Sequence, residues 1–420
     1  MRAPPRFQPL RRALTAGIIG CCAVLLPFKV KAADRARLSS GGRADFLTGD
    51  WYGLRARLSD QGIEFSGSYT LATYRNTTGG VSRGSTVEGA ADLNFDFDPT
   101  KLLHWPDVEF HAGLAIGHGP SVSSERVGDV GSLSSYYIAS GVYLQEFWIQ
   151  KKLLDRRIAL RVGRLAADLE YPLYSFADSI ELPIYPRGAL GAQFRYEPNS
   201  TWFISTAFYA GRSGSSEGAI IAPVAAGLRS TAADAPTVIA MIGLNHGYDP
   251  NPQATAGTWK FGVYHSRGDF ADVATYQPLR GNQGFFVNGD QGLWREHPTI
   301  SGDSQGLSLI VIAEYAPPDR NRYHYGFGGG PYYTGLVRGR DADVLSLNMF
   351  SSFFSKTYAR HSVSSDGPPF RAEHRLQLSY QAFITKYFSI IAEINYVIQP
   401  GGTITALPRS EEHTSELQSR

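Results

Sequence analysis

The sequence predicts an all-β chain that closes into an antiparallel transmembrane β-barrel of about sixteen strands, preceded by a short N-terminal amphipathic helix. Apolar and polar residues alternate over many short segments. Aromatic residues make up 12% of the chain and charged residues only 19%, which suits strands more than surface helices. No linker or break in composition divides the chain, so one large closed sheet explains its length better than several soluble domains.

Residues 1–32 have the pattern of a secretory signal peptide. A basic stretch precedes an apolar run from Ala13 to Phe28, and Val30-Lys31-Ala32 fits a small-x-small cleavage site. The run is short for a membrane-spanning helix, although a retained single-span anchor is the alternative. Both cysteines, Cys21 and Cys22, lie in the part that cleavage would remove. The mature chain is therefore expected to hold no disulfide.

The first element expected in the mature chain is a helix over residues 48–61. Trp51, Leu54 and Leu58 recur at helical spacing. Asp50 is the expected N-cap and Gly62 the expected stop, so the helix should be short and amphipathic.

The strand at Ala91–Asp98, with the sequence ADLNFDFD, shows the alternation most clearly. Leu93, Phe95 and Phe97 fall on one face of an extended strand, and acidic and amide side chains fall on the other. In a membrane barrel such a strand turns its apolar face to lipid and its polar face to an aqueous lumen. A soluble β-sandwich could show the same alternation, so the strand alone does not decide between the two.

Further strands are expected from about residue 63 onward. The alternating segments are Ile63–Leu71, Val108–Ile116, Ile158–Gly163, Ala192–Tyr196, Trp202–Phe208, Trp259–Tyr264, Gly306–Tyr315, Tyr323–Tyr332, Ala342–Phe354, Arg371–Phe383 and Phe388–Ile398. Tyr, Trp and Phe near the strand ends suit the aromatic girdles that mark the two interfaces of a membrane.

Several motifs, met in order along the chain, resemble those of the OprB-type carbohydrate-selective porin family. They are LTGDWYGLR at 47–55, GTWKFGVYH at 257–265, DQGLWRE at 290–296, APPDRN at 316–321, GRDAD at 339–343 and QPGG at 399–402. The resemblance implies a channel in the outer membrane of a Gram-negative bacterium that passes glucose and similar small sugars into the periplasm by passive, weakly selective diffusion. Outer-membrane lipid and the barrel-assembly machinery would be its other partners.

No cofactor, metal or nucleic acid is expected. The net charge of +2 gives no reason to expect nucleic acid, and the histidines form no HExxH pair.

The resemblance fails at the C-terminal end. Residues 409–420, RSEEHTSELQSR, are polar, do not alternate, and match the translation of a sequencing-library adapter. We expect residues 33–408 to form the barrel and residues 409–420 to be an assembly artefact, with a genuine hydrophilic tail as the alternative. The closing strand of the family would then be missing, and lipid does not tolerate the unpaired edge that this leaves.

A sugar channel needs charged or amide groups that hydrogen-bond hydroxyls beside aromatic rings for stacking, and it must bind its solute weakly. The pore-lining candidates are Asp92, Asn94, Asp96, Arg161, Arg164, Asp168, Glu170, Arg195, Lys260, Trp294, Arg295 and Glu296. Arg164 has the opposite parity to Arg161 and qualifies only if its strand has already ended. For each candidate, a solvated lumen charge is the alternative to direct sugar contact.

Two other functional classes stay open from sequence alone. An outer-membrane barrel enzyme acting on lipid or glycan would need a Ser–His or paired-carboxylate constellation, which the sequence does not show. A soluble periplasmic sugar-binding β protein would lack an apolar belt facing lipid.

Overall fold

The structure is a computed structural model that describes residues 15–25, 47–172, 188–210, 236–247, 255–300, 303–361 and 371–402. Its strands are β1 Thr15–Leu25, β2 Ile63–Thr78, β3 Gly84–Phe97, β4 Val108–His118, β5 Gly141–Leu153, β6 Ile158–Leu165, β7 Ala189–Tyr196, β8 Trp202–Tyr209, β9 Thr237–His246, β10 Gly257–Ala271, β11 Pro278–Arg295, β12 Gly306–Tyr315, β13 Tyr323–Thr334, β14 Val344–Phe354, β15 Ala372–Thr385 and β16 Phe388–Ile398. Its helices are η1 Trp51–Gly53, α2 Leu54–Asp60, α3 Thr100–Leu103, η2 Ser123–Val127, η3 Ala167–Leu169, α6 Lys356–His361 and η4 Pro400–Gly402.

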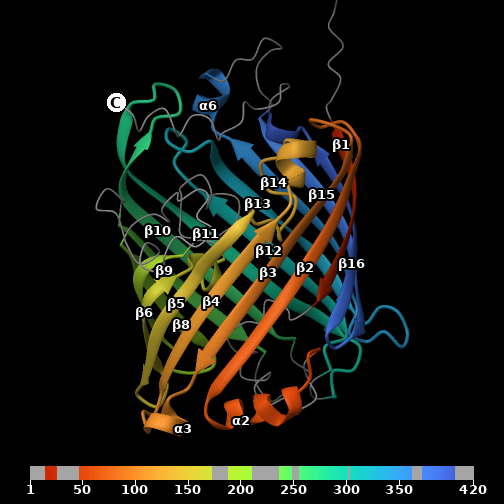
Figure 1. Ribbon diagram of the computed structural model, residues 1–420. Coiled ribbons are helices and arrows are strands. Elements are labelled where there is room, and N and C mark those ends of the chain that lie inside the picture. The colour runs from red at the N-terminus through yellow and green to blue at the C-terminus, as the bar shows by residue number, and fades with distance from the viewer. Residues whose placement is uncertain are drawn as a thin grey trace, which may run out of the picture.

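The sixteen strands form one closed antiparallel barrel in which β2 to β16 follow one another in chain order. Figure 1 shows the strands crossing the barrel obliquely, with α2 and α3 at the lower end and α6 at the upper end. The predicted fold class is therefore confirmed. Among the described residues no helix is long and apolar enough to cross a membrane.

The two faces of the barrel wall differ in polarity. On β3, Val87 and Leu93 are 47% and 48% exposed on the outer face, whereas Glu88, of opposite parity, is 2% exposed on the inner face. The other strands repeat this arrangement with exposed residues such as Leu160, Val263, Leu347 and Leu378. Large exposed apolar side chains on a closed wall form the belt that lipid covers.

Aromatic pairs lie on the outer face near both ends of the strands. Trp294 and Tyr333 lie near the end that carries α2 and α3, with ring centroids 6.2 Å apart. Tyr325 and Phe353 lie near the opposite end, 4.4 Å apart. These pairs match the expected aromatic girdles.

The connections with the most residues join strand ends at the end of the barrel that carries α6, which we call the long-loop end. They span residues 119–140, 166–188, 210–236 and 355–371. We call the end with α2 and α3 the short-turn end. In bacterial outer-membrane barrels the longer loops are extracellular and the short turns periplasmic.

The N-terminal helix is shorter than predicted. Trp51, Tyr52 and Gly53 have positive φ angles of 49°, 58° and 86°, so a regular α-helix begins only at Leu54 and not near residue 48. Asp50 still serves the helix start, because its Oδ1 accepts a hydrogen bond from the Ala56 N–H at 3.0 Å.

Strand β1 occupies the place between β2 and β16. It pairs antiparallel with both, and Cys22 stands opposite Ala72 on one side and Ile391 on the other. The edge expected to be open is thus filled by residues that we also predict to belong to a cleaved signal peptide. Unlike its neighbours, the segment TAGIIGCCAVL shows no polar alternation. The proposed cleavage site and residues 409–420 lie outside the described residues.

Two connections at the long-loop end fold into the barrel. In the segment 119–140, Val122 and Val127 pack against Ala72 and Tyr74 on the inner face of β2. In the segment 166–172, Tyr171 packs among buried residues of β8 and β9. These two inward segments shape the lumen and position the candidate site.

Candidate functional site

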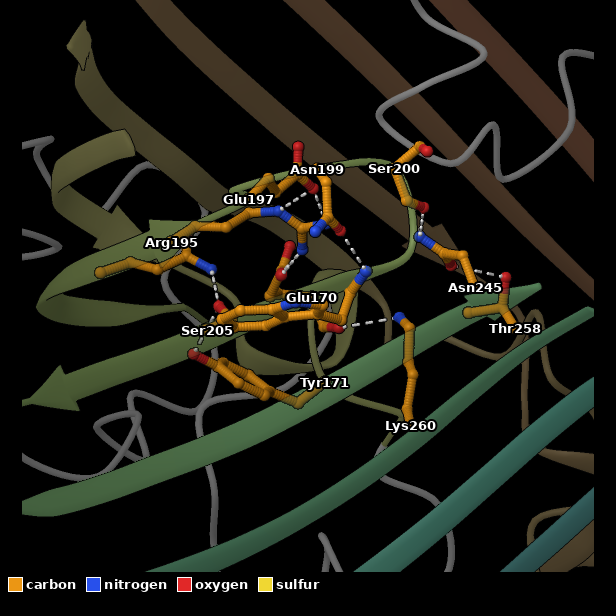
Figure 2. A network of polar contacts seen from close by, with 12 residues as sticks. Glu170, Tyr171, Arg195, Glu197, Asn199, Ser200, Ser205, Asn245, Thr258 and Lys260 are labelled. Atoms are coloured by element: carbon orange, nitrogen blue, oxygen red, sulfur yellow. Dashed lines mark hydrogen bonds and ion pairs between the residues drawn. The ribbon is translucent and has the colours of Figure 1, made fainter. Parts of the chain in front are cut away.

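Three of the predicted residues meet where the segment 166–172 lies against the inner face of the barrel (Figure 2). The Glu170 carboxylate forms an ion pair with the Arg195 guanidinium of β7. The Lys260 ammonium of β10 donates a hydrogen bond to the backbone oxygen of Glu170 at 3.2 Å. Residues from three elements that are distant in sequence therefore form one charged cluster on the inner wall.

The strand register places the side chains of Arg161 and Arg195 on the inner face of the barrel. Arg195 stands opposite Ala159 on β6 and Ser205 on β8, and Arg161 stands opposite Gln193 on β7. Directly opposite residues project from the same face of a sheet. Arg161 and Arg195 therefore share the inner face with Gln193 and Ser205.

Tyr171 fixes the inward segment to the wall. Its hydroxyl lies 3.2 Å from Ser205 Oγ, and Gln193 Nε2 donates to the same Ser205 oxygen at 3.2 Å. Because the Tyr171 side chain is fully buried and hydrogen-bonded, it holds the neighbouring Glu170 in place.

Both arginines lie over aromatic rings. The Arg195 guanidinium carbon is 3.8 Å from the centroid of Phe203, and that of Arg161 is 4.1 Å from the centroid of Trp148. Arg161 also donates from Nη2 to the Gln150 oxygen at 2.9 Å. Stacking leaves the planar edges of these guanidinium groups for hydrogen bonds.

Glu170 remains ionised at neutral pH. Burial raises the pKa of its carboxyl, but the charges of Arg195, Lys260 and Arg161 outweigh burial and the pKa is lowered overall. The carboxylate thus balances part of the positive charge that the three cations bring to this side of the lumen.

The acidic face of β3 lies elsewhere on the inner wall. Asp92, Asn94 and Asp96 share the parity of Glu88, as the alternation predicted. Asp96 Oδ1 is 2.7 Å from Nδ1 of His111 on β4. The His111 ring stacks on Trp148, with centroids 4.9 Å apart, so contacts continue along the wall from Asp96 toward Arg161.

Arg164 lies near the end of β6 and Asp168 in the connection that follows this strand. Strand β6 continues to Leu165, so Arg164 has not left the strand and shares the face of Phe147, its opposite residue on β5. The condition under which Arg164 would line the lumen is not met, and its Nε donates to the Leu144 carbonyl at 2.6 Å. Asp168 lies within η3.

The cluster predicted at residues 294–296 is divided between the two faces. Trp294 stands opposite Leu307, on the outer face and in contact with Tyr333. Arg295 donates to the Asp303 carbonyl at 2.9 Å, and Glu296 accepts from the Tyr333 hydroxyl at 2.8 Å. A bulge between Gly292 and Trp294 shifts the register and turns the ring away from the lumen.

Sequence reasoning missed Trp148, Gln150, Tyr171, Gln193 and Ser205. The first two belong to β5, which was not predicted. Gln150 and Lys152 alternate with Phe147 and Ile149, which indicates a strand with Trp148 on its polar face. This alternation is the sequence signal that could have located β5. Within the described part of the chain, no group of three or more His, Cys, Asp or Glu side chains could hold a metal ion.

A closed barrel with an apolar outer belt, a charged inner wall and loops folded inward is the architecture of a porin. The family described as "Carbohydrate-selective porin, OprB family" matches residues 82–415. The chain belongs to this family and is an outer-membrane channel for carbohydrates rather than an enzyme.

Individual relatives are distant but nearly collinear with the chain. Porin B of Pseudomonas aeruginosa is 21% identical over 438 residues, which cover 92% of this chain and 94% of that protein. The high-pH structure of Pseudomonas putida OprB has a TM-score of 0.72 at 15% identity and covers 85% of this chain and 99% of its own. The low-pH structure of the same protein has a TM-score of 0.52 at 14% identity. At these identities the structural likeness concerns the fold.

Proposed function

We propose that small sugars contact the channel wall at the Glu170–Arg195–Lys260 cluster as they diffuse passively through the barrel. The observation that carries this proposal is the convergence of the three side chains on the inner wall. Sugar hydroxyls both donate and accept hydrogen bonds. The cluster offers donors on the arginine and lysine beside acceptors on Glu170 and Glu197.

Binding at this cluster should be weak. Arg195 already pairs with Glu170 and Glu197, and Arg161 already bonds Gln150, so a sugar must compete with existing contacts. A solute in transit has to leave as easily as it enters, and such competition favours rapid release. Glucose and similar small sugars fit this mode of weak, multi-point hydrogen bonding.

We also propose that a signal peptide of residues 1–32 exports the chain and that the barrel-assembly machinery inserts it. The basic and apolar pattern of this segment supports export, and the exposed apolar belt requires lipid. The intact mass of the protein isolated from outer membranes tests the cleavage, because a retained N-terminus would contradict it.

Proteoliposome swelling tests the sugar site. Arg195→Gln and Lys260→Met should reduce glucose uptake relative to that of a non-sugar solute of equal size. Arg156→Gln is the control, because Arg156 is an exposed residue of the β5–β6 turn that pairs with Asp107. All variants must first show the heat-dependent gel shift of an assembled barrel. An unchanged uptake ratio in both assembled variants would refute the proposed site.

A further inference from the structure

We propose that the segment 119–140 is an internal brace that joins the two ends of the barrel sheet. In chain order the sheet begins with β2 and β3 and ends with β15 and β16, and only β1 lies between these ends. The segment leaves β4, crosses the inner face of this seam and returns to β5. This role does not depend on where sugars bind.

The segment is anchored first to β2 and β3. The Glu88 carboxylate of β3 accepts a hydrogen bond from the Val122 N–H at 2.6 Å. From β2, Asn76 Nδ2 donates to the carbonyl of Arg126 at 3.1 Å. The Arg126 guanidinium in turn donates to Thr86 Oγ1 of β3 at 3.2 Å.

Its other anchor lies beyond the seam, on β15. The Glu373 carboxylate accepts hydrogen bonds from the N–H groups of Val130 and Gly131, both at 3.0 Å. It also accepts one from Gly401 of η4 at 2.7 Å. Two residues along the strand, Arg375 Nη1 donates to the carbonyl of Ser132 at 3.1 Å.

Apolar packing joins the two anchors. Val122, Val127 and Leu133 of the segment form one buried cluster with Ala72 and Tyr74 of β2 and Val397 of β16, and each of these six residues is at most 3% exposed. A single core therefore spans the seam on the inside of the barrel. None of these contacts involves residues 15–25, so the brace would persist if those residues left with a signal peptide.

Glu373 is the point at which the brace can be tested most directly. Three backbone N–H groups converge on its two oxygens, and a glutamine would present one oxygen and an NH₂ group to the same donors. Buried N–H groups that lose their acceptor are costly, so Glu373→Gln should release the segment.

The test compares Glu373→Gln with Glu109→Gln in the full chain. Glu109 of β4 is another acid of the inner face, but it bonds Gln150 and Lys152 of β5 and none of the residues of the brace named above. Two readouts are needed: the rate of trypsin cleavage after Arg126 and the temperature at which the compact barrel band disappears on a gel. Asn76→Ala loosens the other anchor and provides a milder second variant.

We expect Glu373→Gln to speed cleavage after Arg126 about tenfold and to lower the conversion temperature, with Asn76→Ala acting in the same direction. Glu109→Gln should match the wild type in both readouts. Unchanged cleavage in both brace variants would overturn the proposal. Faster cleavage with an unchanged conversion temperature would overturn it too, because the segment would then be a loop that does not stabilise the barrel.

Discussion

The Glu170 carboxylate and the Arg195 guanidinium form an ion pair that ties a segment folded into the barrel to the inner face of strand β7. Glu170 is also held through its backbone by Lys260, and Tyr171 beside it is hydrogen-bonded to Ser205. The loop and the wall therefore form one unit, and the charge on Glu170 offsets part of the charge of the surrounding cations.

Removing the Glu170 charge should shift the ion selectivity of the channel toward anions. Glu170→Gln leaves Arg161, Arg195 and Lys260 without their buried counter-charge, and fixed charges in a confined lumen attract mobile ions of the opposite sign. The chloride-to-potassium permeability ratio, measured from the reversal potential in a salt gradient, should rise about twofold or more. Glu197→Gln is the matched control, because Glu197 pairs with the same arginine but is more exposed and should shift the ratio less. An equal shift in the two variants would contradict a special role for Glu170.

The same carboxylate should give the barrel a component of stability that depends on acid. The pKa of Glu170 is raised by burial but lowered further by Arg195, Lys260 and Arg161, so its folded value lies below that of the unfolded chain. The stability that the ion pair contributes is therefore complete above about pH 4.3, the ordinary value for Glu, and is lost as the pH falls through the lowered value. Unfolding of the wild type in denaturant between pH 7 and pH 3 should show this loss, and Glu170→Gln should lack it. Identical pH profiles of stability in the wild type and Glu170→Gln would show that the Glu170 carboxylate is not the source of this acid dependence.

Asp343, the last residue of the GRDAD motif, should stabilise the turn between β13 and β14. Its carboxylate accepts hydrogen bonds from Arg340 Nε at 2.7 Å, the Tyr380 hydroxyl at 2.5 Å and the Phe383 N–H at 2.9 Å. Burial raises the pKa of Asp343, but these bonds lower it overall. Asp343→Asn should reduce the free energy of unfolding by about 1–3 kcal/mol. Asp341→Asn, at an exposed neighbour in the same turn, should have little effect.

Sequence pattern located strands best where one face meets lipid and the other meets water. The ends of β12 and β16, Gly306–Tyr315 and Phe388–Ile398, are those expected from alternation alone. Strand β9 was missed because its inner residues Ile239 and Met241 pack in the same core as Tyr171, so apolar side chains stand on both faces. Strand β5 was missed because a bulge opposite Gly113 and Leu114 interrupts its alternation.

The candidate site was predictable only in part, for a related physical reason. Arg161, Arg195 and Lys260 have the parity of regular strands, which sequence reveals. The inward fold of the segment 166–172 depends on bonds to Gln193 and Ser205, which lie on strands distant in sequence. Similarly, only the register shift on β11 determines which way Trp294 points.

Trp294 should serve the membrane interface and not the sugar. Its ring is 52% exposed on the outer face and lies against Tyr333, the position of an aromatic girdle. Trp294→Ala should lower the free energy of unfolding in lipid by about 1–3 kcal/mol, because apolar area that lipid covers is lost. It should leave the glucose uptake of proteoliposomes at the wild-type value. Arg195→Gln should show the opposite pattern, with altered uptake in an assembled barrel. A loss of glucose uptake in Trp294→Ala with unchanged stability would indicate that this ring faces the lumen. That result would contradict the register of β11.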